Sequence, residues 1–396
     1  MKESPEIHFT PEQELLLWSI RVDQAKDQRI EEILKAGVDW NYVRETAIQH
    51  GIIPLLYRRL KEEMSHLVPS DKLEELRALF MANAVQNLRM TQQLTKVLEL
   101  LANAGIEAMP FKGPALAVQA YGDLSMRSFC DLDILIHEKD FNRMYLAFEE
   151  AGYPSDYPVN LRTEAKFITY QKKNLAISYQ GIHLEIHWKI IERFLSVPID
   201  MYQLWAESFP ILLNGRKMMT LSPEDMVIVL CVHGTKHFWN NLKWLADLVN
   251  LILEYPDLDW HEISMKAENI RVKRIVALGL ALAQEHGGII YPEDNKYRLI
   301  SDIDIKNCTT IVQTNFFQLP SSKLSISPPW FFLKLRESFR DKANFFIYTL
   351  TDRILPPNYL DFKIISLPDS LFPVYLIIRP FRLLKDYYHQ RIRSSI

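Results

Sequence analysis

Two aspartates, set two positions apart inside an apolar run, constrain this chain more than any other feature. Asp131 and Asp133 lie in residues 128–136 (SFCDLDILI), whose alternation predicts a strand. Side chains two apart on a strand point to the same face of the sheet, so the two carboxylates project together. Their repulsion raises both pKa values unless a cation is present. The pattern therefore predicts a cradle for a divalent metal ion.

A third acid lies on a later strand. Glu185 belongs to residues 182–188 (IHLEIHW), and this alternation places it on one face with His183 and His187. We expect Glu185 to complete the cradle as third ligand or general base. His187 is a candidate for contact with the substrate or with the metal ligands. The alternative is that all three side chains face water.

A glycine turn upstream predicts a phosphate site. Residues 106–112 (IEAMPFK) form an expected strand, Gly113 breaks it, and residues 114–120 form a short helix with Pro114 in the first turn. The unpaired N–H groups and the dipole of a helix N-terminus attract anions, and Lys112 stands beside the turn. Phosphoryl and nucleotidyl transfer require this pairing of a phosphate site with a metal site, where two cations lie roughly 3.5–4 Å apart.

An ordered set of motifs resembles a known group of enzymes. A strand ending in glycine, a helix, Asp-x-Asp on the next strand and a later lone acid are similar to the DNA polymerase β-like nucleotidyltransferase superfamily. The closer resemblance is to the bacterial family of uncharacterised nucleotidyltransferases. In the centre it is carried by residues 111–116 (FKGPAL), 121–123 (YGD), 127 (R), 131–133 (DLD) and 185–188 (EIHW). On either side it extends through residues 39–40 (DW), 50–57 (HGIIPLLY), 233–237 (HGTKH), 242–247 (LKWLAD) and 375–380 (YLIIRP).

The resemblance implies a fold and a reaction. The fold is α+β, with a nucleotidyltransferase core (a mixed sheet flanked by helices) between N-terminal and C-terminal helical lobes. The reaction moves a nucleoside monophosphate from a nucleoside triphosphate (NTP) such as ATP to an acceptor hydroxyl or phosphate. Asp131 and Asp133 would hold two Mg²⁺, with Mn²⁺ as the other candidate ion. Glu185 would ligate the metal next to the acceptor and help to remove its proton. A small-molecule or modified-peptide acceptor is favoured, and protein and tRNA stay open.

One position departs from the superfamily pattern. Many members follow the glycine with a serine that contacts the triphosphate, whereas here Pro114 follows Gly113. Lys112, Ser125 or Arg127 would supply the replacement donor, and Arg127 suits bidentate contact with a phosphate. The alternative for Arg127 is a salt bridge to the carboxylates.

A histidine pair lies further along the chain. His233 and His237 are four residues apart on an expected helix, so both rings share a face and would form half of a zinc site. The glutamate of metalloproteases is missing between them, which favours a packed or substrate-facing pair. Because the family resemblance extends over this stretch, Lys236, His237 and Asp247 are candidate base, phosphate or acceptor contacts.

The periodicity divides the chain into four parts. Residues 1–104 are expected to form an N-terminal helical lobe, and residues 105–215 the catalytic core, with strands at 106–112, 130–136, 174–180 and 182–190. A capping serine, Ser222, predicts the first helix of a second lobe over 216–320. A cluster of proline and serine between 318 and 330 predicts a linker to an aromatic and basic extension, 321–396.

Composition limits the partners and the compartment. The net charge of −3 provides no global attraction to nucleic acid. Three widely spaced cysteines argue against a disulfide framework and predict a reducing, cytoplasmic location. No run reaches the length of a transmembrane segment. The basic tail from Arg379 is expected to form a solvated helix face, and weak contact with a membrane surface is the alternative.

Two other classes of function stay open. A metallohydrolase would use His183, Glu185 and His187 as a metal site on one strand and would bind Zn²⁺ or Mn²⁺ without nucleotide. A catalytically silent nucleotide-binding protein would result if the turn at Gly113 and Pro114 no longer supported a triphosphate.

Overall fold

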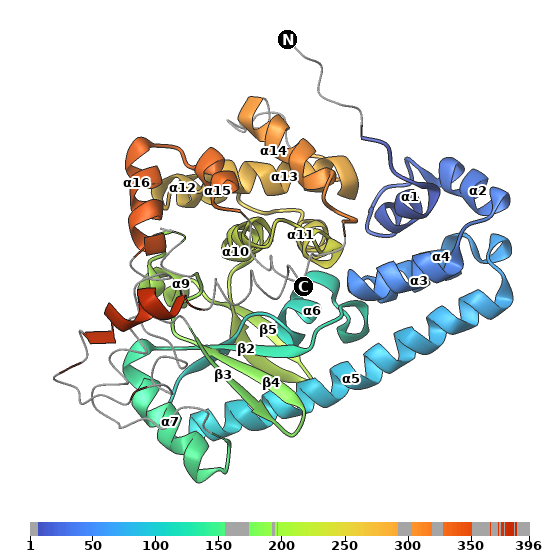
Figure 1. The fold of residues 1–396 in the computed structure, drawn as a ribbon. Helices are drawn as coiled ribbons and strands as arrows, with labels where there is room; N and C mark the ends of the chain where they lie inside the picture. The colour runs from blue at the N-terminus through green and yellow to red at the C-terminus, as the bar shows by residue number, and fades with distance from the viewer. Residues whose placement is uncertain are drawn as a thin grey trace.

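A small mixed sheet lies among helices from both ends of the chain (Figure 1). The computed structural model describes residues 7–154, 174–191, 197–291, 303–318 and 328–350, with residue 195 and several positions between 365 and 385. The expected α+β class is confirmed. Among the described residues, no helix combines the length and the apolar composition that a membrane span requires.

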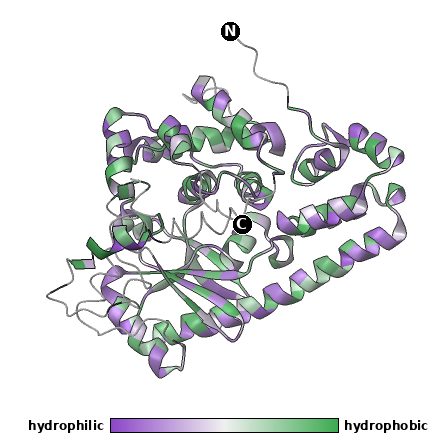
Figure 2. Ribbon diagram, viewed as in Figure 1, coloured by the Kyte–Doolittle hydropathy of each residue, from purple (hydrophilic) through white to green (hydrophobic). Residues whose placement is uncertain are grey.

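The N-terminal part is helical up to the first strand, as predicted. Its helices are α1 (Pro11–Trp18), α2 (Asp27–Ala36), α3 (Trp40–Gln49), α4 (Ile53–Glu63) and α5 (Ser70–Asn103). The side chain of Thr10 caps α1, and that of Asp39 caps α3. Along α5, hydrophilic and hydrophobic bands alternate (Figure 2), because only one stripe of this long helix is buried.

The sheet has the strand order β1-β2-β4-β3. Its members are β1 (Ala108–Pro110), β2 (Asp131–Ile136), β3 (Asn174–Tyr179) and β4 (Ile182–His187). β2 runs parallel to β4, whereas the β1–β2 and β3–β4 pairs are antiparallel. All four strands lie inside the ranges that alternation predicted. Helices α6 (Pro114–Tyr121) and α7 (Phe141–Glu150) follow β1 and β2, respectively.

A second sheet is a hairpin that the sequence analysis did not predict. It consists of β5 (Phe209–Leu213) and β6 (Arg216–Thr220). Asn214 and Gly215 form the turn with φ of 52° and 75°, and this dipeptide is the usual one for two positive φ values. The expected boundary at residue 215 therefore falls inside the hairpin. Leu213 is buried in the hydrophobic cluster of the main sheet.

Helices dominate again after the hairpin. They are α9 (Met201–Ala206), just before it, and then α10 (Pro223–Lys236), α11 (Leu242–Glu254), α12 (Trp260–Asn269), α13 (Lys273–Gly287), α14 (Ile303–Gln313), α15 (Pro329–Leu335) and α16 (Phe339–Tyr348). Ser222 caps α10 as predicted, accepting a hydrogen bond from the backbone N–H of Asp225. Most of the expected linker between 318 and 330 lies outside the described residues.

Two hydrophobic clusters organise the molecule. The larger one joins helices from before and after the sheet, with Trp18 and Leu56 in the same cluster as Leu245 and Leu282. The smaller one lies around the sheet and includes Leu94 of α5 and Phe148 of α7. Helices α10 and α11 consequently contact each other, and α11 contacts α6. This packing brings residues from beyond position 230 next to the turn at Gly113.

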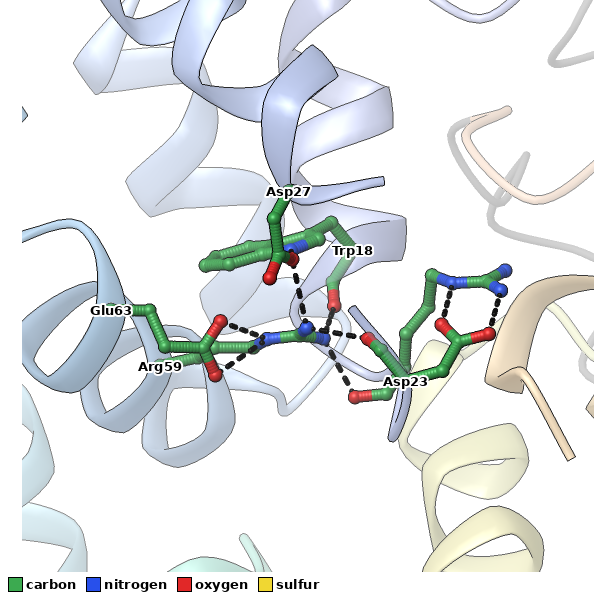
Figure 3. A network of polar contacts seen from close by, with 6 residues as sticks. Trp18, Asp23, Asp27, Arg59 and Glu63 are labelled. Atoms are coloured by element: carbon green, nitrogen blue, oxygen red, sulfur yellow. Dashed lines mark hydrogen bonds and ion pairs between the residues drawn. The ribbon is translucent and has the colours of Figure 1, made fainter. Parts of the chain in front are cut away.

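A buried arginine holds the N-terminal helices together (Figure 3). The guanidinium of Arg59 on α4 lies 4.2 Å from the ring centroid of Trp18 and donates to three backbone carbonyl oxygens between α1 and α2. It also contacts the carboxylates of Asp27 and Glu63, each at 3.2 Å. The fixed fork of donors in arginine matches this set of acceptors, whereas lysine has no such fork.

We expect Arg59→Met to lower the free energy of unfolding by about 3 kcal/mol, because it leaves buried carbonyl groups without a donor. Denaturant unfolding followed by circular dichroism measures the loss. Arg58→Met is the matched control, since Arg58 is exposed and Glu62 is its one ion-pair partner among the described residues, so its change should stay within about 0.5 kcal/mol. Equal losses in the two variants would contradict this account.

Candidate active site

The register of β2 and β4 determines which side chains meet. In this parallel pair, Asp131 lies opposite His183, Asp133 opposite Glu185, and Leu135 opposite His187. Alternate residues of a strand share a face, so the acids of β2 and the acid and histidines of β4 all project to one side. The expectation that Glu185 joins the Asp-x-Asp pair from another strand agrees with this register.

Asp133, Glu185 and His187 converge. One potential ligand atom from each lies within 4.8 Å of the others. The Nε2 of His187 is 2.9 Å from Asp133 Oδ1 and 3.3 Å from Glu185 Oε2. Both neighbours are acceptors, so Nε2 carries the hydrogen that His187 donates. Its Nδ1 is buried without a hydrogen-bond partner among the described residues, and the edge of the Phe111 ring packs against the imidazole with 5.1 Å between centroids.

Asn174 supports the third acid from the neighbouring strand. Its side-chain amide donates to Glu185 Oε2 at 2.6 Å, across the antiparallel pair of β3 and β4. The sequence analysis did not select Asn174. The available signal was its position at the start of an expected strand, but the register of two strands separated by a turn is needed to connect it with Glu185.

Asp131 lies outside the convergent group and is more exposed than Asp133. Burial, and secondly the carboxylate of Asp133, raise the pKa of Asp131. This is the direction expected for paired carboxylates. Three cations, Lys112, Arg127 and Lys243, act in the opposite sense on the same carboxyl group.

The glycine turn touches the start of β2. Gly113 has φ of 53° and ψ of −126°, and a Cβ there would lie only 2.9 Å from the backbone oxygen of Asp131. Only glycine fits at such a close approach with positive φ. Pro114 opens α6 directly afterwards, as predicted. The N-terminus of α6 and the Asp-x-Asp strand are therefore in contact.

The histidine pair lies beside this turn. The Nζ of Lys112 is 3.3 Å from Nδ1 of His233, whose ring centroid lies 4.7 Å from that of His237. Trp244 of α11 packs against both rings. Neither histidine belongs to a metal-competent cluster among the described residues. The pair is packed, and Lys236 precedes His237 in the last turn of α10.

Two of the candidate phosphate donors have partners elsewhere. Arg127 forms a buried bidentate pair with Asp247 of α11, through Nε at 2.8 Å and Nη2 at 3.0 Å. Tyr121 donates a third hydrogen bond to the same carboxylate. The sequence analysis gave a salt bridge to Asp131 and Asp133 as the alternative role of Arg127. Arg127 does form a salt bridge, but its partner is Asp247, 120 residues further along the chain. The hydroxyl of Ser125 donates to Asp123 inside a local turn.

The acids fit a hard divalent cation. Carboxylate oxygens are the ligands that Mg²⁺ and Mn²⁺ accept, and those of Asp133 and Glu185 already point to a common donor, Nε2 of His187. His183 does not belong to this group, because it is exposed and its Nδ1 lies 2.8 Å from Ser178 Oγ. Among the described residues, Asp133 therefore joins Glu185 and His187 in the group that could hold a metal, and His183 does not.

Comparison with protein-family models identifies the family of this chain. A family model, "Uncharacterised nucleotidyltransferase", matches residues 36–288. This chain belongs to that family, and membership supports an enzyme of nucleotidyl transfer with an NTP substrate.

The other comparisons add little. A crystal structure of an antigenic nucleotidyltransferase-like protein from Paracoccidioides brasiliensis has 14% identity and a TM-score of 0.28, over 50% of this chain and 91% of that one. This similarity is too low to inform the fold or the site. A search of curated proteins finds no match.

We expect Asp247→Asn to lower the free energy of unfolding by about 3 kcal/mol, because it leaves the buried guanidinium of Arg127 without its counter-charge. The double variant Arg127→Met with Asp247→Asn should recover part of that loss, since no unpaired charge is left and Asn can still accept from Tyr121. Urea unfolding of the wild type, both single variants and the double variant measures the coupling. Additive losses would show that the pair does not stabilise the fold.

Proposed function

We propose that this protein transfers a nucleoside monophosphate from an NTP to an acceptor hydroxyl or phosphate, with Mg²⁺ or Mn²⁺ as cofactor. The observation that carries the proposal is the convergence of Asp133 and Glu185 beside a glycine turn, in a chain of the nucleotidyltransferase family. The turn supplies a helix N-terminus for phosphates, and the acids supply oxygen ligands on the adjoining strand.

Asp131, Asp133 and Glu185 would hold the metal ions. Bound there, the ions would neutralise charge on the attacking and leaving oxygens of the phosphoryl group. The pKa of Asp131 is raised by burial and by Asp133, so a bound cation would relieve the repulsion between the two carboxylates. Asp133 is the central acid, because it is buried and faces both Asp131 along its strand and Glu185 across the sheet.

Glu185 would accept the proton of the acceptor. Its carboxylate is partly exposed, so an acceptor can approach it, and Asn174 fixes its orientation by a hydrogen bond at 2.6 Å. A base held in one rotamer by neighbours can act without first reorganising. His187 would position the two carboxylates through Nε2, as a group that orients the acids and does not react.

The NTP phosphates would bind at the N-terminus of α6, with Lys112 beside them. Arg127 and Ser125 are less suited to this role than the sequence suggested, since each is already engaged by an aspartate. Lys236 and His237 lie at the end of α10, where the ring centroid of His237 is 4.7 Å from that of His233, and both are candidates for contact with the base or the acceptor. A small molecule or modified peptide is the favoured acceptor.

The cysteines and the basic tail bear on where in the cell the protein acts. Three unpaired cysteines favour a reducing compartment, so we propose a cytoplasmic location. Exposed Ile377 and Phe381 stand beside Arg382 in the basic tail, which fits weak contact with a membrane surface.

A thermal-shift screen of the four ribonucleoside triphosphates, with and without Mg²⁺, tests this function. A ligand at 100 times its dissociation constant stabilises the native state by roughly 2.7 kcal/mol. We expect stabilisation by at least one NTP only when Mg²⁺ is present, and none in the variant Asp131→Asn with Asp133→Asn. Without metal, the melting temperature of that variant should hold or rise, because the repulsion between the carboxylates is gone.

His183→Asn is the control for this screen, since His183 shares the face but lies outside the convergent group. It should keep the full response to NTP and Mg²⁺. Stabilisation by Zn²⁺ or Mn²⁺ alone, with no effect of any NTP, would favour a metallohydrolase. NTP binding unchanged in the double variant would remove the central role of the two aspartates.

A further inference from the structure

One lysine near the site has no partner of its own. Lys243 is the second residue of α11 and is only partly exposed. Among the described residues its amino group forms no hydrogen bond and no ion pair within 4.0 Å. Asp247, one helical turn further along α11, is taken by Arg127 and Tyr121. A partly buried ammonium group without a counter-charge is less stable than a paired one, and an anionic ligand would supply the missing charge.

The direction of this side chain is fixed by its surroundings. The backbone N–H of Lys243 donates to Asn241 Oδ1 at 3.0 Å and approaches the carbonyl oxygen of His50 at 3.2 Å. The aliphatic stem passes Gly51 so closely that a Cβ there would lie 3.2 Å from the lysine Cδ. This contact restricts the aliphatic stem of Lys243. Binding of a ligand to the amino group therefore costs less side-chain entropy of the lysine.

The groups that act on the amino group are those of the active site. Burial, first, and then Arg127 lower the pKa of Lys243, while Asp247, Asp131 and Cys130 oppose them. Lys243 acts in turn on the carboxyl group of Asp131, together with Lys112 and Arg127. Lys243 lies one helical turn before Asp247 on α11, so its side chain is on the face of this helix that holds Arg127, four residues before Asp131.

The acidic and basic groups of the site come from different elements. Asp133 of β2 and Glu185 of β4 contact His187, and Glu185 also contacts Asn174. Lys112 comes from the turn before α6, and Lys243 comes from α11, which packs against α6. A substrate with a strongly negative end matches this division, with the negative end next to the two lysines and the reacting atom next to the acids.

We propose that Lys243 and Lys112 form a cationic subsite for the β- and γ-phosphates of the NTP, and so for the pyrophosphate leaving group. This inference rests on the proposed function. The subsite supplies the donors that are missing where Pro114 follows Gly113, and it leaves the pair of Arg127 and Asp247 intact. Lys243 is separated from the glycine turn by 130 residues and belongs to a helix outside the strand motifs.

Lys243→Met tests the subsite, because methionine keeps most of the stem and removes the charge. Isothermal titration calorimetry in Mg²⁺ would measure binding of an NTP, of the corresponding monophosphate and of inorganic pyrophosphate. The affinities for NTP and pyrophosphate should fall by roughly ten- to a hundred-fold, the range of a charge-assisted hydrogen bond. The affinity for the monophosphate should change by less than about three-fold.

Two further variants separate charge from fold. Lys243→Arg keeps the charge and should retain part of the affinity for NTP and pyrophosphate. Lys217→Met removes an exposed lysine of β6 and should leave all three affinities unchanged. The melting temperature of ligand-free Lys243→Met should hold or rise, since an unpaired partly buried charge is removed. If this variant does not fold, Lys243→Gln takes its place.

The outcomes distinguish the subsite from the proposed function. Unchanged NTP affinity in Lys243→Met, or equal losses for triphosphate and monophosphate, overturns the subsite while NTP binding by the wild type still supports the function. A wild-type protein that binds pyrophosphate through Lys243 but no NTP upholds the subsite and contradicts the function. A wild type that binds neither contradicts both.

Discussion

The parallel pairing of β2 with β4 is the constraint on which the site depends. It places Asp133 directly opposite Glu185 and leaves His187 within 3.3 Å of both carboxylates. A shift of register by one residue would turn every side chain of a strand to the other face. The buried residues of the opposite face, including Leu132, Ile134 and Leu184, prevent that shift because they fill the smaller hydrophobic cluster. Hydrophobic packing thus holds the acids in place.

The helices complete the site from a distance in sequence. Trp244 of α11 packs against the ring of His233, which lies beside Lys112. Asp247 of the same helix pairs with Arg127. Both contacts exist because the larger hydrophobic cluster packs together helices that come before and after the sheet in the sequence. The Arg127–Asp247 pair then fixes α11, which also carries Lys243, to the segment that leads into β2.

The sequence predicted what local patterns control. Alternation located the strands, glycine and proline located the turn before α6, and a capping serine located the start of α10. These features depend on neighbours along the chain, so a single sequence carries them. The role of Asp131 and Glu185 as ligands stays a prediction, although the register brings their strands together.

Contacts between distant segments could not be predicted from the sequence. Nothing near Arg127 in the sequence indicates that Asp247 neutralises it, and nothing near Lys243 indicates that its helix packs against α6. The hairpin of β5 and β6 was missed although Asn214 and Gly215 carry the local signal of its turn, because its strands are short and partly polar. Long-range pairing is decided by packing, and single-sequence patterns do not encode it.

The most direct test of the account is a crystal structure of the wild-type protein with Mn²⁺ and a non-hydrolysable ATP analogue, in which anomalous scattering locates the metal. The account predicts Mn²⁺ between Asp131, Asp133 and Glu185, with the triphosphate at the N-terminus of α6 and its terminal phosphates toward Lys112 and Lys243. It is contradicted if no nucleotide binds at Gly113, or if one Mn²⁺ ion held by Asp133, Glu185 and His187 is all that appears with or without the analogue.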